Sequence, residues 1–130
     1  MPDPIPPENQ LAIRVTAMPA DANAYGDIFG GWLMSLMDSA AGLVAARYAK
    51  GRAVTIAVEA MKFHAPVFVG DEVSVYADLA RVGRTSMTIE VQSWRRDRHA
   101  EQSCLVTQAR FTFVAIDERR MPRVIGEEFV

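Results

Sequence analysis

The sequence contains few of the residues that form disulfide frameworks, metal sites or nucleic-acid interfaces. Its single cysteine, Cys104, cannot form a disulfide within the chain, and we therefore expect a reducing, cytoplasmic environment. The two histidines, His64 and His99, are too few and too poorly spaced for a metal site, so we expect them to be structural or solvated. The formal net charge of −2 excludes nucleic-acid binding through bulk charge.

The amino-acid sequence also shows no pattern typical of a targeting signal, a membrane span or internal repeats. The first ten residues, MPDPIPPENQ, hold four of the seven prolines and no basic segment followed by an apolar one, which predicts a flexible arm. The longest apolar run contains Asp38 and Arg47, which indicates a core helix and not a membrane span. We expect a flexible arm at residues 1–10, one domain at 11–117 and a polar tail at 118–130.

The segment Asn23–Lys50, NAYGDIFGGWLMSLMDSAAGLVAARYAK, is the most distinctive part of the chain. It begins with turn residues, passes through Gly30 and Gly31, and then continues without proline as far as the natural stop at Gly51. Nearly every side chain in this run is apolar or small, which predicts a helix buried on most of its circumference. Asp38 is the exception, because an unpaired carboxylate is costly to remove from water.

A helical wheel puts Asp38 on a stripe of small residues and the bulky side chains on the other side. The small residues are Ser35, Gly42, Ala45, Ala46 and Ala49, and the bulky residues are Trp32, Leu33, Leu36, Leu43 and Val44. Another molecule or chain can therefore approach the helix closely at Asp38. The residues leave two interpretations open, since the carboxylate is either a functional group or a structural one bonded to a neighbouring strand or subunit.

The remainder of the chain predicts β-strands. A first strand precedes the helix, at Leu11–Met18, and four longer strands follow it. These four are Ala53–Phe63, Glu72–Val82, Ser86–Arg96 and Gln102–Ile116, the last with Leu105, Ala109, Phe111 and Phe113 on one side. Their short connections predict successive antiparallel neighbours. The fold class is therefore α+β, with a long central helix wrapped by a twisted antiparallel sheet of about five strands, and its open edges favour oligomerisation through an edge strand.

Three motifs carry a family resemblance. They are MPADANAYGDIFGGWLMSLMDSAAG at Met18–Gly42, VTIAVEAMKFHAPVFVGDEV at Val54–Val73 and VGRTSM at Val82–Met87. Together they resemble the hot-dog-fold acyl-CoA thioesterases of the YciA and cytosolic (brain) acyl-CoA hydrolase type. The resemblance implies hydrolysis of acyl-CoA to a carboxylic acid and coenzyme A, without a cofactor or a metal. It extends over nearly the whole predicted domain.

The resemblance also implies roles for the residues around the predicted helix. Asp38 corresponds to the catalytic carboxylate, while Asn23 and Asp27 occupy a loop that helps to form the site. Gly30 and Gly31 fall where a backbone amide near the helix N-terminus polarises the thioester carbonyl. Glycine and an unpaired helix N-terminus suit this role, because the backbone can then approach a developing oxyanion closely.

Further substrate-binding candidates lie on the predicted strands. Arg84, Thr85 and Ser86 follow Gly83 and are candidates for binding the coenzyme A phosphates or pantetheine arm, with an ordinary hairpin turn as the alternative. Lys62 is a candidate for the nucleotide, unless it lies on a solvated edge. The last two are Thr55 and Val58, which we expect to line an acyl tunnel beside the helix. The Arg95–Arg98 run is predicted to be a solvated hairpin tip.

Two chemical routes and one geometric consequence follow. Asp38 can act as a general base on water or as a nucleophile that forms an anhydride, and the sequence leaves both open. Gly30 precedes Asp38 by eight residues, which is roughly 12 Å along a helix, so both cannot contact one thioester carbon within a single chain. We therefore expect active sites at a dimer interface, two per dimer. The resemblance adds a trimer of such dimers, with a tetramer left open.

Two other functions remain as alternatives. A hot-dog dehydratase or hydratase generally needs a histidine opposite the carboxylate, and neither the predicted helix nor its preceding loop contains one. A non-catalytic acyl-CoA sensor is expected to carry a fused output module, for which the ten-residue arm leaves no room. Acyl-CoA hydrolysis is therefore the leading prediction.

Overall fold

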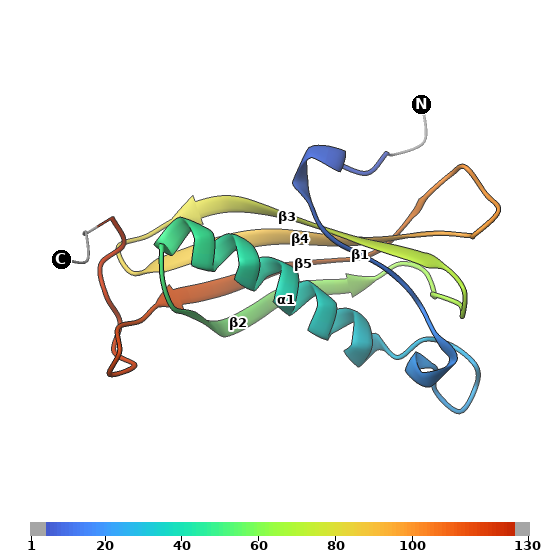
Figure 1. Ribbon diagram of the computed structural model, residues 1–130, viewed down its shortest axis with the longest axis horizontal. Helices are drawn as coiled ribbons and strands as arrows, with labels where there is room; N and C mark the ends of the chain where they lie inside the picture. Colours follow the sequence, from blue (N-terminus) through green and yellow to red (C-terminus); the bar gives the residue numbers. More distant parts are fainter. Residues whose placement is uncertain (1–4, 127–130) are drawn as a thin grey trace.

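The computed structural model describes residues 5–126, in which one long helix lies across one face of a five-stranded antiparallel sheet (Figure 1). The elements are η1 (Glu8–Gln10), β1 (Leu11–Thr16), η2 (Pro19–Asp21), α1 (Gly30–Ala49), β2 (Ala53–Phe63), β3 (Glu72–Val82), β4 (Ser86–Arg96) and β5 (Cys104–Ala115). The α+β class is confirmed. The predicted bounds of β2, β3 and β4 are also confirmed, while β1 and β5 are slightly shorter than predicted.

The order of the strands differs from the prediction at β2. The sheet order is β1-β3-β4-β5-β2, so β2 pairs with β5 and not with its successor β3. Within the described residues, only the β3–β4 and β4–β5 connections are hairpins between neighbours. The connection at residues 64–71 is long enough to cross from one side of the sheet to the other, which sequence alone did not reveal. As a result β2 and β1 are the two edges, and β2 is the longer one.

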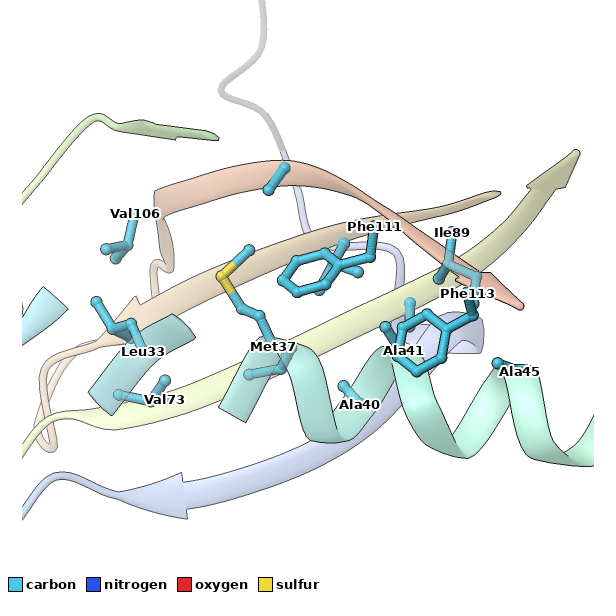
Figure 2. Close-up of a cluster of buried hydrophobic side chains, with 14 of the residues drawn as sticks. Leu33, Met37, Ala40, Ala41, Ala45, Val73, Ile89, Val106, Phe111 and Phe113 are labelled. Atoms are coloured by element: carbon cyan, nitrogen blue, oxygen red, sulfur yellow. The ribbon is translucent and has the colours of Figure 1, made fainter. Parts of the chain in front are cut away.

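One stripe of α1 packs against the sheet and forms the core. Its buried residues are Leu33, Met37, Ala40, Ala41, Ala45 and Ala49, at the spacing expected for one helical face. Figure 2 shows the first five of them against sheet residues that include Val73, Ile89, Phe111 and Phe113. Part of the predicted stripe of small residues is thus covered by the chain's own sheet, because alanine side chains let the strands come close.

The opposite face of α1 is open in the single chain. Leu43 is 57% exposed, and Met34 and Tyr48 are exposed as well. The prediction of a helix buried on most of its circumference is therefore wrong for one chain, because a single sheet can cover only one face of a helix. No helix within residues 5–126 has the length and apolar character needed to cross a membrane.

A bulge changes which residues of β5 enter the core. The register between β4 and β5 shifts between Ser93 and Trp94, so that Ser93 pairs with Thr107 and Trp94 pairs with Leu105. Val106, the residue skipped between these pairs, is fully buried. Leu105 was expected on the same face of β5 as Ala109, Phe111 and Phe113. That expectation fails because the extra residue of the bulge reverses the alternation of side chains.

Residues 117–126 pack against the C-terminal end of α1. Lys50, in the left-handed conformation at φ 54°, ends the helix, and Arg123 Nη2 donates a hydrogen bond of 2.6 Å to the Ala49 carbonyl. Ile125 packs against the core. At the other terminus, Glu8 of the predicted arm forms a 3.2 Å ion pair with Arg14 of β1. Residues 1–4 of that arm and 127–130 of the predicted tail lie outside the described residues.

Candidate active site

The N-terminus of α1 has no side-chain cap among the residues that the structure describes. The helix begins at Gly30 after Phe29, which forms no side-chain capping bond. A Cβ added at Gly30 would lie 3.4 Å from the ring of Phe63, whereas a Cβ added at Gly31 would meet no atom within 4 Å. The first turn therefore presents backbone N–H groups and the positive end of the helix dipole to an open space beside Gly31.

The loop before α1 is shaped by Asn23. The side-chain oxygen of Asn23 accepts hydrogen bonds from the N–H groups of Tyr25, at 2.8 Å, and Asp27, at 3.1 Å. The N–H of Asn23 in turn donates to the Asp27 carbonyl at 2.7 Å. Asn23 therefore closes the turn through Gly26, whose φ of +87° favours glycine. Asp27 itself is exposed.

Asp38 lies at the margin of the buried stripe of α1 and contacts β2. Thr55 Oγ1 donates a hydrogen bond of 2.5 Å to Asp38 Oδ1, which ties the carboxylate to the neighbouring strand. Within residues 5–126 the other carboxylate oxygen has no hydrogen bond. The contact matches what a structural carboxylate requires, and it also leaves one oxygen in a fixed orientation and available for chemistry.

Two bulges decide which residues of β2 face α1. Thr55 pairs with Phe113 and Val58 pairs with Phe111, and both phenylalanines belong to the core beneath the helix. Strict alternation would put Thr55 and Val58 on opposite faces, but the register shifts between Thr55 and Ala57. Thr55 and Val58 therefore both face the α1 side of the sheet, which is the arrangement that a common acyl tunnel beside the helix requires.

The remaining candidates lie elsewhere in the single chain. After a second register shift, Lys62 pairs with Gln108 and lines a hollow of about 210 Å³ with Gln108 and Arg110, on the face away from α1. The candidates Arg84, Thr85 and Ser86 form the β3–β4 hairpin. There the Arg84 carbonyl accepts the N–H of Ile125, in the segment that packs on the C-terminal end of α1. The chain therefore brings Asp38 and Thr55 together but separates them from these residues.

Phe63 was missed by the sequence analysis. It stands at the end of β2 and its ring covers Gly30, so it forms a wall beside the helix N-terminus. A large aromatic residue that ends a strand just before the His64–Pro66 turn was the available signal. Thr55 was expected only as a lining residue, whereas it is the hydrogen-bond partner of Asp38.

A larger cavity is lined by other residues. Its volume is about 800 Å³, and it is lined by residues of the arm, of the connection after β2 and of the β4–β5 hairpin, including Ile5, His64, Arg96 and Cys104. None of the candidate residues lines it. Among the residues that the structure describes, no three His, Cys, Asp or Glu side chains are grouped so as to hold a metal ion.

Comparison with known proteins identifies the family. Residues 25–102 match the thioesterase superfamily. The chain belongs to that superfamily. It is 58% identical over 120 residues to an uncharacterized acyl-CoA thioester hydrolase of Zymomonas mobilis, covering 92% of this chain and 80% of the relative. It is 45% identical over 125 residues to the acyl-CoA thioester hydrolase YciA of Escherichia coli, covering 94% and 95%.

A solved structure agrees with the sequence relatives. The hexameric thioesterase y2039 of Yersinia pestis superimposes with a TM-score of 0.85 at 45% identity, covering 91% of this chain and 96% of that one. The predicted resemblance to acyl-CoA thioesterases of the YciA type is therefore confirmed for this thioesterase-superfamily chain. The roles of its individual site residues stay predictions.

Proposed function

We propose that the protein hydrolyses the thioester of acyl-CoA to a free carboxylic acid and coenzyme A. The observation that carries the proposal is the Asp38 carboxylate of α1, which is oriented by a hydrogen bond from Thr55 of β2. The N-terminus of the same helix α1 is open at Gly31. The names of the relatives at 58% and 45% identity support this reaction. The cytoplasmic location and the lack of a cofactor stay predictions from the sequence.

The reaction needs a group that activates the attacking oxygen and a group that stabilises the oxyanion. As a general base, Asp38 takes a proton from water while the water oxygen attacks the thioester carbon. As a nucleophile, its oxygen attacks that carbon directly, and water then hydrolyses the resulting anhydride. In both routes the C–S bond breaks, and the coenzyme A sulfur leaves as a thiolate that takes up a proton. The amides of Gly30 and Gly31 stabilise the negative carbonyl oxygen.

The two groups come from different chains in this proposal. Gly30 and Asp38 lie eight residues apart on the continuous helix α1, or roughly 12 Å at 1.5 Å per residue. A second copy that places its own α1 antiparallel beside the first brings the Asp38 of one chain close to Gly31 of the other. Such a dimer has two-fold symmetry and therefore two sites.

The exposed surface favours a second copy at β2. This strand is a long, unpaired edge, and it carries exposed apolar side chains that include Ile56, at 59%, together with Val54, Val58 and Phe63. An unpaired edge with such side chains is a template for pairing with another strand. The open face of α1 with Leu43 extends the apolar area. The hexameric state of the Yersinia pestis neighbour supports assembly of three such dimers.

Coenzyme A contacts also fit this arrangement. In an antiparallel pair of helices, the C-terminal end of one α1 lies beside the N-terminal end of the other. The β3–β4 hairpin of the first chain lies near the C-terminal end of its α1. This pairing therefore brings its residues Arg84, Thr85 and Ser86 toward Gly31 of the partner chain, where the thioester is bound. Lys62 faces the other side of the sheet, so a contact between Lys62 and the nucleotide requires a substrate that extends around the β2 edge.

The direct test is release of free thiol from a panel of acyl-CoAs, acetyl through palmitoyl. We expect turnover by the wild type, and its complete loss in Asp38→Asn with acyl-CoA binding retained. Asp78→Asn is the matched control, because Asp78 is an exposed carboxylate on β3 outside the site. Turnover retained by Asp38→Asn would refute the role of Asp38. Binding of acyl-CoA without turnover by the wild type on any chain length would favour a sensor.

A further inference from the structure

The connection between β2 and β3 holds the loop that leads into α1. The N–H of Ile28, two residues before the helix, donates a hydrogen bond of 3.0 Å to the carbonyl of Val67. Next to this bond, Asp27 and Phe68 form an isolated antiparallel bridge. The entry of the chain into the first turn of α1 therefore depends on where the backbone of Val67 and Phe68 lies.

Asp71 clamps the backbone of Phe68 from both sides. Its carboxylate Oδ2 accepts the N–H of Phe68 at 3.0 Å, and its own N–H donates to the Phe68 carbonyl at 3.1 Å. The turn between them passes through Gly70, at φ +94°, a conformation that glycine adopts without strain. Asp71 is only 4% exposed, so this carboxylate is almost entirely removed from water. A buried carboxylate of this kind needs a partner.

Arg95 is that partner. Its Nη1 lies 3.5 Å from Asp71 Oδ2, and its guanidinium stands over the ring of Phe68 at 5.3 Å from the centroid. Arg95 pairs with the core residue Val73 across β3 and β4, so it points to the α1 side of the sheet, and its side chain is 24% exposed. The prediction that the Arg95–Arg98 run is a solvated tip is therefore wrong at Arg95, which ends a buried stretch of strand.

We propose that Asp71 and Arg95 are positioning residues for thioester hydrolysis. Asp71 and Arg95 fix the position of Phe68. Through their backbone contacts with Asp27 and Ile28, Phe68 and Val67 then set the direction of the N–H groups at the start of α1. This inference rests on the proposed function, in which those N–H groups stabilise the oxyanion. A misplacement of about 1 Å in such a group can cost about 10²-fold in rate, so a clamp outside the site affects the chemistry.

Kinetics of Asp71→Ala separate positioning from substrate binding. With the acyl-CoA that the wild type hydrolyses fastest, we expect kcat to fall about tenfold and KM to change less than about twofold, because an interaction made in the transition state is weakened. Asp71→Asn keeps an oxygen that accepts the Phe68 N–H, so it should recover most of kcat. Arg98→Ala is the control, since Arg98 is exposed in the hairpin tip of the same run.

The ion pair is tested by a double-mutant cycle. Arg95→Gln is expected to lower kcat less than Asp71→Ala does, and the double variant should be no worse than Asp71→Ala alone, because both act through Phe68. All rates are measured at a temperature at which circular dichroism shows each variant to be folded. A lower Tm with an unchanged kcat in Asp71→Ala and Arg95→Gln would overturn the proposal, because the pair would then only stabilise the fold.

Hydrogen exchange gives a readout that does not depend on activity. In Asp71→Ala or Arg95→Gln, the amides of residues 25–33 should exchange faster, while those in the C-terminal half of α1 should be unchanged. Unchanged exchange at residues 25–33 would refute the coupling between this clamp and the helix N-terminus. A wild type that hydrolyses no acyl-CoA would refute the proposed function, and the exchange measurement would still decide on the coupling.

Discussion

Thr55 on β2 and Asp38 on α1 are joined by a hydrogen bond of 2.5 Å, seventeen residues apart in sequence. The bond joins an edge strand to the middle of the helix, at the point where a bulge begins in β2. It gives a single orientation to a carboxylate that would otherwise rotate freely. A fixed orientation matters for both chemical routes open to Asp38, since each requires an oxygen aimed at a defined position.

Replacement of Thr55 by valine should lower the rate without unfolding the protein. Valine has nearly the same shape but donates no hydrogen bond to Asp38. Hydrogen bonds to charged groups contribute about 1.5–3 kcal/mol, and loss of that amount in the transition state is roughly a 10- to 100-fold lower kcat. Thr55→Ser should restore the rate. Thr88→Val is the control, because Thr88 stands between the buried residues Met87 and Ile89 on β4 and away from Asp38. An unchanged kcat in Thr55→Val would contradict the proposed role of Thr55.

Gly31→Val should separate stability from activity. A Cβ at this position meets no atom of its own chain within 4 Å, and valine is a better helix residue than glycine by a few tenths of a kcal/mol, so Tm should be equal or higher. If the thioester carbonyl approaches here, the isopropyl group blocks it, and the rate should fall by at least about 10²-fold. Thermal unfolding and thiol release measure the two effects. Full activity in this variant would move the oxyanion donor to another position.

Two inactive variants should restore activity when they are combined. In a mixed dimer of Asp38→Ala and Gly31→Val chains, one site has two damaged groups and the other has both intact. Random pairing of equal amounts then gives about a quarter of the wild-type activity, by the symmetry of a two-site dimer. Co-expression with different affinity tags allows the mixed species to be isolated and assayed. Each variant alone is the control, and no recovery in the mixed dimer would contradict a site shared between chains.

Arg123→Ala should lower stability and leave the reaction intact. Arg123 Nη2 donates to the Ala49 carbonyl at the end of α1, where backbone acceptors have no partner within the helix. The variant also loses the 3.3 Å hydrogen bond from Arg123 Nε to the Ile116 carbonyl. Together these losses should lower the free energy of unfolding by about 1–2 kcal/mol, as measured by urea denaturation. Arg119→Ala, at an exposed position in the same segment, provides the comparison. An equal loss in both variants would mean that the cap itself contributes nothing.

The secondary structure was predictable because it rests on local patterns. Alternation of apolar and polar residues defined β3 and β4 to the residue, and the proline-free apolar run defined α1. Asp38 stood out because a carboxylate in an apolar run is costly. The motifs around it pointed to the family, and the 12 Å between Gly30 and Asp38 followed from the helical rise alone.

Other features needed the assembled chain. A bulge leaves no mark in the alternation of short apolar residues, so neither the burial of Val106 nor the register shift that lets Thr55 and Val58 share one face was readable. The long connection at residues 64–71 hid the move of β2 to the far edge. Arg95 looked like one charge among several, and only its contacts with Asp71 and Phe68 distinguish it.

The sequence by itself determined the elements, the family and the exceptional carboxylate, because local periodicity and motif spacing are properties of neighbouring residues. Only the tertiary structure decided what stands next to that carboxylate and which faces are left open. The pairing of β2 with β5 puts Thr55 beside Asp38 and leaves β2 as a free apolar edge. Contacts between distant segments depend on the register and crossing of whole strands, and that information is spread over the entire chain.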